Sequence, residues 1–144
     1  MGKKRIVKKS GSGVNKGLKA RALSRTPKKK LVNGILNIHA TYNNTKVLLA
    51  DTSGNAVMSS SAGSLGFSGA KKSTPFAAAK VGEVLGEKAK AMGLKDVAAV
   101  IKGVGPGRES ALRAFASKGI DITAITDATP VPFNGPRKRR PRRV

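Results

Sequence analysis

A glycine-rich stretch in the C-terminal half of the chain restricts most strongly what this sequence can fold into. It reads Gly103-Val104-Gly105-Pro106-Gly107-Arg108 and follows the short apolar run Val97–Lys102. After it, Leu112, Phe115 and Ala116 recur with the spacing of one helix face. The pattern predicts a strand, a tight turn and a helix, which is the first part of a β-α-β crossover in a parallel sheet.

The start of this helix is also a candidate anion site. Its unpaired N–H groups and the positive end of its dipole point outward, and Arg108 adds a full charge. Two nucleotide-binding motifs do not match. The Walker A motif needs Lys-Ser/Thr after its last glycine, but Gly107 is followed by arginine and Glu109. The dinucleotide-binding motif GxGxxG fails because its third glycine, Gly107, comes one residue too early. The motif alone fits equally well a tight connection that binds nothing.

The distribution of charge favours nucleic acid as the partner. The chain carries 29 Lys and Arg against 7 Asp and Glu, a net charge of +22. Residues 1–30 hold 12 of the basic residues and residues 131–144 hold 6, and neither segment has an acidic residue. Such a charge imbalance requires a polyanion that neutralises the two extensions.

Several other functions are not indicated by the composition. No apolar run approaches the roughly 20 residues of a membrane span, and neither extension has the apolar face of an interfacial helix. There is no cysteine, and His39 is the only histidine, so we expect no metal site and no cofactor. His39 itself is expected to be structural. With 1 Tyr, 4 Phe and no Trp, phosphate contacts should dominate over base stacking.

The chain is predicted to divide into a basic N-terminal extension (residues 1–30), a globular α/β domain that binds nucleic acid (residues 31–130) and a basic C-terminal tail (residues 131–144). The N-terminal extension is predicted to be disordered, with room for one helical turn around Gly17–Leu23. In the domain, strands are predicted at Leu31–Ala40, Lys46–Asp51, Ala56–Ser61, Val97–Lys102 and Ile120–Thr126, and helices at Pro75–Met92 and Arg108–Lys118.

The long helix has clear start and stop signals. Thr74 is a good N-cap, Pro75 suits the first helical position and Gly93 is the expected stop. The preceding loop, residues 59–74, is rich in small residues and ends in Lys71-Lys72-Ser73, which places two cations beside a second helix N-terminus.

The element order βββαβαβ predicts a mixed five-stranded sheet of ribonuclease-H-like architecture, without catalytic carboxylates. We expect Val97–Lys102 to be covered on both faces, and Ile120, Ile122 and Ala124 to share one side of the last strand.

A nuclease of that architecture needs converging carboxylates. The first predicted strand has none. Asp51, Asp96 and Asp121 are not expected to meet at one sheet end, and Glu83 and Glu87 lie on the polar face of a helix. The chain is therefore predicted not to be an enzyme.

Five motifs of the domain and tail together resemble the family of the eleventh protein of the small ribosomal subunit, in its bacterial type. They are Ala40-Thr41-Tyr42-Asn43-Asn44-Thr45, Ser61-Ala62-Gly63, Lys72-Ser73-Thr74-Pro75-Phe76-Ala77-Ala78, Gly105-Pro106-Gly107-Arg108-Glu109-Ser110, and Ile125-Thr126-Asp127-Ala128-Thr129-Pro130. The resemblance covers residues 31–144.

This resemblance implies a structural constituent of the small ribosomal subunit, in the cytoplasm. The family binds small-subunit ribosomal RNA in the platform, bridges RNA helices and lies beside the mRNA exit and the Shine–Dalgarno cleft, where it supports assembly and translation. Its neighbours include small-subunit proteins six, seven, eighteen and twenty-one, and initiation factor three is a further partner.

Carried over position by position, the resemblance implies a set of RNA-facing residues. They are Asn43, Asn44, Thr45, Lys71, Lys72, Ser73, Gly107, Arg108, Arg137, Lys138, Arg139, Arg140, Arg142 and Arg143. The chain departs from its relatives at Phe133 and Pro136, where histidine and cysteine are usual. Asn134 precedes a glycine and is a candidate for isoaspartate formation, with an ordinary turn as the favoured alternative.

Two other functions remain open from the residues alone. A DNA-packaging protein would share the charge, but it should bind duplex DNA as well as structured RNA. A ribonuclease-H-like nuclease would cleave an RNA–DNA hybrid in the presence of a metal.

Overall fold

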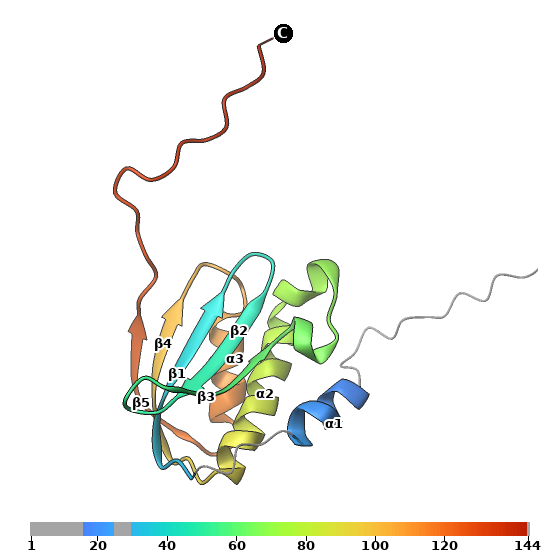
Figure 1. Ribbon diagram of the computed structural model, residues 1–144, viewed down its shortest axis with the longest axis vertical. Helices are drawn as coiled ribbons and strands as arrows, with labels where there is room; N and C mark the ends of the chain where they lie inside the picture. The colour runs from blue at the N-terminus through green and yellow to red at the C-terminus, as the bar shows by residue number, and fades with distance from the viewer. Residues whose placement is uncertain (1–15, 25–29, 144) are drawn as a thin grey trace, which may run out of the picture.

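The computed structural model describes residues 16–24 and 30–143. Helix α1 precedes a domain of three strands followed by a helix, a strand, a helix and a strand (Figure 1). The elements are α1 (Lys16–Ser24), β1 (Asn33–Ala40), β2 (Thr45–Ala50), β3 (Ala56–Ser61), α2 (Pro75–Ala91), β4 (Asp96–Lys102), α3 (Arg108–Ala116) and β5 (Asp121–Asp127). The predicted elements are present, and their bounds differ from the predicted ones only near their ends.

The five strands form one mixed sheet in the order β3-β2-β1-β4-β5. Strands β1, β2 and β3 pair antiparallel, whereas β4 pairs parallel with both β1 and β5. Because parallel strands run in the same direction, the carboxyl ends of β1, β4 and β5 lie together at one end of the sheet. The predicted mixed α/β sheet is confirmed.

Helices α2 and α3 pack on the same face of the sheet, side by side (Figure 1). The strand side chains that point toward the helices are buried, including Leu36 and Ile38 of β1 and Val47 and Leu49 of β2. Phe115 of α3 is buried with them in the same core. The other face of the sheet has no helix over it in the described part of the chain. Because only one face of the sheet is covered by helices, buried and more exposed residues alternate along the central strands β1 and β4.

The prediction that Val97–Lys102 is covered on both faces is wrong. Val97, Ala99 and Ile101 are buried, but Ala98 and Val100 between them are only half-buried. An unbroken apolar run does not reveal which of its faces receives a helix, because both helices of the crossovers lie on one side here.

Strand β5 differs from its prediction because of a bulge. Val97 pairs with Ile122, but the next residue, Ala98, pairs with Ala124. Paired residues point to the same side of a sheet, and Val97 and Ala98 point to opposite sides. Ile122 and Ala124 therefore do not share a face, contrary to expectation.

Helix α2 begins and ends where the sequence indicates. The Thr74 hydroxyl accepts a hydrogen bond from the Ala77 N–H at 3.3 Å, and Pro75 occupies the first turn. Gly93 follows the helix with φ +87°, a conformation that favours glycine. The loop before α2 is not wholly irregular, since it contains two short 3-10 helices, Gly63–Leu65 and Gly69–Ser73.

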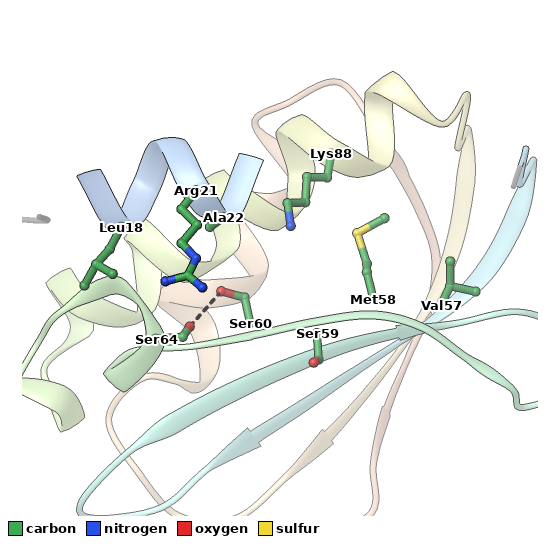
Figure 2. Close-up of a pocket in the computed structure, with 9 residues that line it drawn as sticks. All are labelled: Leu18, Arg21, Ala22, Val57, Met58, Ser59, Ser60, Ser64 and Lys88. Atoms are coloured by element: carbon green, nitrogen blue, oxygen red, sulfur yellow. Dashed lines mark hydrogen bonds between the residues drawn. The ribbon is translucent and has the colours of Figure 1, made fainter. Parts of the chain in front are cut away.

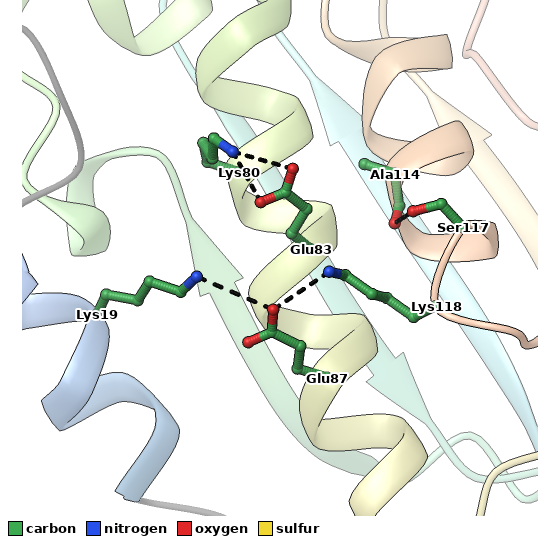
Figure 3. Close-up of polar contacts among 7 residues, drawn as sticks. All are labelled: Lys19, Lys80, Glu83, Glu87, Ala114, Ser117 and Lys118. Carbon is green, nitrogen blue, oxygen red and sulfur yellow. Dashed lines mark hydrogen bonds and ion pairs between the residues drawn. The ribbon is translucent and has the colours of Figure 1, made fainter.

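Two glycines let α3 approach α2 closely. A Cβ built on Gly82 would lie 2.4 Å from the Ala111 carbonyl oxygen, and one on Gly86 would lie 2.7 Å from the Lys118 side chain. Figure 3 shows Glu87 of α2 between two lysines: its carboxylate lies 3.2 Å from Lys118 and 3.9 Å from Lys19 of α1. The polar face of α2 that was expected to be solvated is therefore partly covered at Glu87, by Lys19 of α1 and by Lys118, which follows α3.

Helix α1 is longer than the single turn that the sequence allowed. It spans Lys16–Ser24, where the extension was predicted to be disordered, and Ala22 and Leu23 pack against the core. The rest of that prediction, on residues 1–15 and 25–29, lies outside the described residues. None of the helices in the described part of the chain is both long and apolar enough to cross a membrane.

Candidate nucleic-acid interface

Three of the predicted contact segments lie together at the carboxyl edge of β1 and β4. The β1–β2 turn, the loop after β4 and the start of α2 meet there, because Gly107 touches both Thr45 and Ala78. We call this end of the molecule the carboxyl edge. Residues that are far apart in the sequence, 43–45, 71–73 and 107–108, thus belong to one region.

The glycines of the loop after β4 are explained by packing against the protein itself. A Cβ on Gly103 would lie 2.1 Å from the Ala40 carbonyl oxygen, and one on Gly105 would lie 2.3 Å from that of Thr41. The Gly105 N–H also donates to Ala40 O at 3.0 Å. Of the two interpretations of this motif, a tight connection accounts for the glycines without a ligand.

A cleft remains between the starts of α2 and α3. Its volume is about 410 Å³, and it is lined by Pro75, Gly105, Pro106, Arg108, Glu109, Ser110 and Arg113. Glu109 occupies the first turn of α3, where a carboxylate interacts favourably with the helix dipole, and it pairs with Arg113 at 3.0 Å. The α3 terminus therefore already has a negative group beside it.

Thr45 and Gly107 do not reach the surface as the resemblance implied. Thr45 is 0 % exposed, and a Cβ on Gly107 would lie 2.2 Å from its hydroxyl oxygen. The Thr45 hydroxyl is buried without a hydrogen-bond partner among the described residues. The side chain of Thr45 therefore fills the space beneath the loop and has no direct path to a ligand.

Arg108 is held by the protein rather than presented to solvent. Its guanidinium donates to the Gly103 carbonyl oxygen and to the carboxylate of Asp127, and it reaches the Thr129 hydroxyl at 3.1 Å. The Thr129 hydroxyl donates in turn to Asp127 at 2.6 Å and accepts from the Gly103 N–H at 3.1 Å. We call these four residues the latch, because they join the α3 start to the end of β5.

The latch has a clear electrostatic signature. Hydrogen bonds from the Thr129 hydroxyl, from Arg108 and from the Thr129 N–H lower the pKa of Asp127 from 3.8 to about 2. Thr129 lies just before the C-terminal tail, which runs away from the sheet, so the latch fixes the point from which the tail leaves.

The other predicted contacts are exposed to different degrees. Asn43 is exposed at the tip of the β1–β2 turn, whereas Asn44 is half-buried and the oxygen of its side-chain amide is buried without a partner among the described residues. Lys71 is exposed and Lys72 is half-buried beside the start of α2. The Ser73 hydroxyl donates to Ala70 O at 3.1 Å.

Lys46 and Lys102 were not among the predicted contacts, although they lie at the same edge. His39 pairs with Lys46 on β2 and with Lys102 on β4, so the three side chains form one row across the open face of the sheet. All three are exposed. Alternation along each strand was the available signal, but the pairing that aligns them depends on the register.

The C-terminal tail leaves the carboxyl edge and runs away from the sheet (Figure 1). Its six cations, Arg137, Lys138, Arg139, Arg140, Arg142 and Arg143, are exposed. Phe133 is 96 % exposed, and Asn134 adopts φ +56°, the left-handed conformation common for asparagine in turns.

The prediction that Asp51, Asp96 and Asp121 do not meet at one sheet end is wrong. Strand β2 runs antiparallel to β1, whereas β4 and β5 run parallel to β1. Asp51 at the end of β2 therefore lies at the same sheet edge as Asp96 and Asp121, which open β4 and β5 and pair directly.

Asp51 is occupied in its own turn. Its carboxylate accepts hydrogen bonds from the N–H groups of Ser53 and Asn55 at 3.1 and 3.0 Å, which stabilises the β2–β3 connection. Among the described residues, no three His, Asp or Glu side chains are arranged to hold a metal ion.

The chain resembles a known protein family. The family model described as Ribosomal protein S11 matches residues 34–143. The matched segment begins in β1 and includes every predicted contact residue, but it leaves out α1.

Proposed function

Because the chain belongs to the ribosomal protein S11 family, we propose that it binds small-subunit ribosomal RNA in the platform and bridges several RNA helices there. Membership makes the chain a structural component of the small ribosomal subunit, in the cytoplasm, and an RNA-binding protein of translation rather than an enzyme. The finer proposal concerns where on the subunit it lies and which of its residues touch RNA.

The convergence at the carboxyl edge is the observation that carries this proposal. Asn43, Lys71 and Lys72 come from separate elements and lie in one region, together with Lys46 and Lys102. A surface of lysine and amide side chains suits phosphate and sugar contacts, which position a protein on RNA without reading its sequence.

The tail extends this surface. Its six exposed cations leave from the same edge and can follow a groove between RNA helices, where they would order on binding. Arg108 and Thr45 have structural roles in this proposal. Arg108 fixes the start of the tail through the latch, and Thr45 packs beneath Gly107 in the loop after β4.

The resemblance to the family supports further proposals on partners. We propose small-subunit proteins six, seven, eighteen and twenty-one as neighbours, mRNA nearby at the exit and Shine–Dalgarno cleft, and initiation factor three as a transient partner. The exposed Phe133, where relatives usually have histidine, would meet these neighbours or RNA through apolar contact.

The salt dependence of RNA binding tests the proposal. For each phosphate that the tail neutralises, the log–log slope of affinity against salt should steepen by about 0.7 to 0.9. A chain that ends before Arg137 should therefore show a flatter slope than the full chain on small-subunit ribosomal RNA. An unchanged slope would mean that the tail does not bind phosphates.

Two controls separate this function from its alternatives. Structured ribosomal RNA should outcompete duplex DNA of equal length, whereas a DNA-packaging protein would bind both. The native protein should also co-sediment with small subunits; if it sediments free of ribosomes, the proposed placement is refuted.

A further inference from the structure

A second cationic site lies between α1 and the edge strand β3. A pocket of about 400 Å³ opens there. It is lined by Leu18, Arg21 and Ala22 of α1, Val57, Met58, Ser59 and Ser60 of β3, Ser64 of the following 3-10 helix, and Lys88 of α2. Four elements thus contribute to one pocket (Figure 2).

The charged groups of the pocket all have the same sign. Arg21 and Lys88 are its ionisable residues, and no acidic side chain lines it. A guanidinium and an ammonium are donors only, so they attract an anion with several acceptor oxygens. Figure 2 shows the guanidinium of Arg21 beside Ser60 and Ser64, with the amine of Lys88 directed from α2 toward β3.

Lys88 is an unexpected residue for its position. It is 7 % exposed on a helix face that otherwise buries alanine, valine and leucine, where an apolar side chain would avoid the cost of desolvating a charge. Lys88 already has an interaction within the chain. Its three N–H bonds allow it to serve a ligand at the same time.

The serine hydroxyls add a donor on the opposite wall. Ser64 donates its proton to the Ser61 carbonyl oxygen at 2.7 Å and accepts from the Ser61 N–H at 3.0 Å. The Ser60 hydroxyl lies 3.5 Å from that of Ser64, which is a long contact. Rotation of the Ser60 hydroxyl toward the pocket would therefore cost little.

We propose that this pocket binds a phosphate group of the RNA backbone. The inference rests on the proposed RNA-binding function, because the phosphate belongs to that RNA. A phosphate offers acceptor oxygens in several directions, which suits donors that converge from α1, α2 and β3. No aromatic side chain lines the pocket, so a base would find no ring on which to stack.

The site also gives α1 a function. Helix α1 lies outside the segment that matches the family, residues 34–143, and it carries Lys16, Lys19 and Arg21 without any acidic residue. A phosphate between Arg21 and Lys88 would join α1 to the domain electrostatically. Binding of RNA at this site would therefore hold the N-terminal extension in place.

The test uses NMR on the full-length chain. The Arg21 Nε–H signal and the amide signals of Ser60 and Ser64 are followed while inorganic phosphate, a short single-stranded oligoribonucleotide or a glutamate-rich peptide is added. Arg21→Gln removes the pocket cation, and Lys16→Gln removes an equal charge from the same helix at a residue that does not line the pocket.

We expect phosphate and the oligoribonucleotide to shift the serine signals in the unaltered chain and in Lys16→Gln, and this shift to disappear in Arg21→Gln. Equal shifts in both variants would overturn the proposal. A response to inorganic phosphate but not to the oligoribonucleotide would also overturn it, as would a stronger response to the acidic peptide, which would assign the pocket to a protein partner.

A second measurement separates this inference from the proposed function. On small-subunit ribosomal RNA, Arg21→Gln should lower the log–log salt slope by about 0.7 to 0.9, because one phosphate is no longer neutralised. Lys88→Met, which keeps the side-chain volume, should do the same, with the exposed Lys90→Met as its control. If the unaltered chain binds RNA and Arg21→Gln keeps its slope, only the pocket is refuted; if the unaltered chain does not bind, the proposed function fails.

Discussion

At the scale of single residues, several side chains that look like ligand contacts hold the carboxyl edge together. Thr45 lies beneath Gly107 with its hydroxyl buried, and Arg108 is bound by Asp127 and Thr129. Residue type alone does not separate these roles, because a threonine or an arginine that packs against the protein and one that faces RNA have the same chemistry.

Replacement of Thr45 by valine tests its structural role. The change removes a buried hydroxyl that has no hydrogen-bond partner among the described residues and keeps the volume. We expect stability to stay equal or to rise by about 1 kcal/mol, since an unsatisfied buried donor costs roughly 1–3 kcal/mol. Chemical denaturation measures the stability, and RNA affinity should stay unchanged; a loss of affinity without a loss of stability would restore Thr45 as a contact.

The latch predicts a dependence of stability on acid pH. The pKa of Asp127 is lowered to about 2 in the fold from 3.8, so the ionised carboxylate stabilises the fold above pH 3.8. This contribution is lost as the pH falls from 3.8 through about 2. Thermal unfolding between pH 5 and pH 1.5 should therefore show a drop in Tm that is smaller in Asp127→Asn.

The comparison with Asp127→Asn isolates this residue from the other carboxylates, which titrate in both proteins. If both proteins lose the same Tm over that pH range, the Asp127 carboxylate does not contribute to stability through the latch.

At the scale of elements, the packing of α2 against α3 depends on two glycines. Gly82 and Gly86 face α3, so the two backbones approach more closely than any side chain would allow. This packing sets the position of the α3 start, and with it the loop after β4 at the carboxyl edge.

Gly82→Ala should therefore destabilise the protein. In an exposed helix the change would stabilise by about 1 kcal/mol, because alanine is the better helix former. Here the new Cβ would lie 2.4 Å from the Ala111 carbonyl oxygen, and overpacking of this kind costs about 1–3 kcal/mol. Urea unfolding gives the sign directly, and a stabilised variant would show that α3 can move aside.

Gly17→Ala provides the matched comparison. Gly17 is exposed in α1, so alanine there should raise helix content in that segment without loss of stability.

At the scale of the whole molecule, charge and topology act together. The exposed lysines at the carboxyl edge and the cationic tail lie at one end of the sheet, while Asp51, Asp96 and Asp121 lie at the other. RNA should therefore approach the carboxyl edge first, which orients the domain before the extensions bind.

Two double variants with equal charge changes test this polarity. Lys71→Gln with Lys72→Gln should lower RNA affinity and reduce the log–log salt slope by about 0.7 to 0.9 for each phosphate that is no longer neutralised. Lys90→Gln with Lys95→Gln removes the same charge at the other end of the domain and should change the slope less. Equal effects would show that only net charge matters.

The sequence by itself determined the five strands, the helices α2 and α3, and their order. Alternating and helical spacings, the Thr74 cap and the glycine at position 93 act over a few residues, so local patterns contain them. It also determined the two basic extensions, and with the family motifs it indicated which segments meet RNA.

The tertiary structure alone decided what depends on contacts between distant residues. It placed both crossover helices on one face of the sheet, aligned Lys46 and Lys102 through the strand register, and gathered three aspartates at one edge. It also bound Arg108 to a residue 19 positions away and laid α1 over β3. None of these features follows from a local pattern. Each is fixed by contacts between segments far apart in the chain, and neither segment alone contains a signal for the contact.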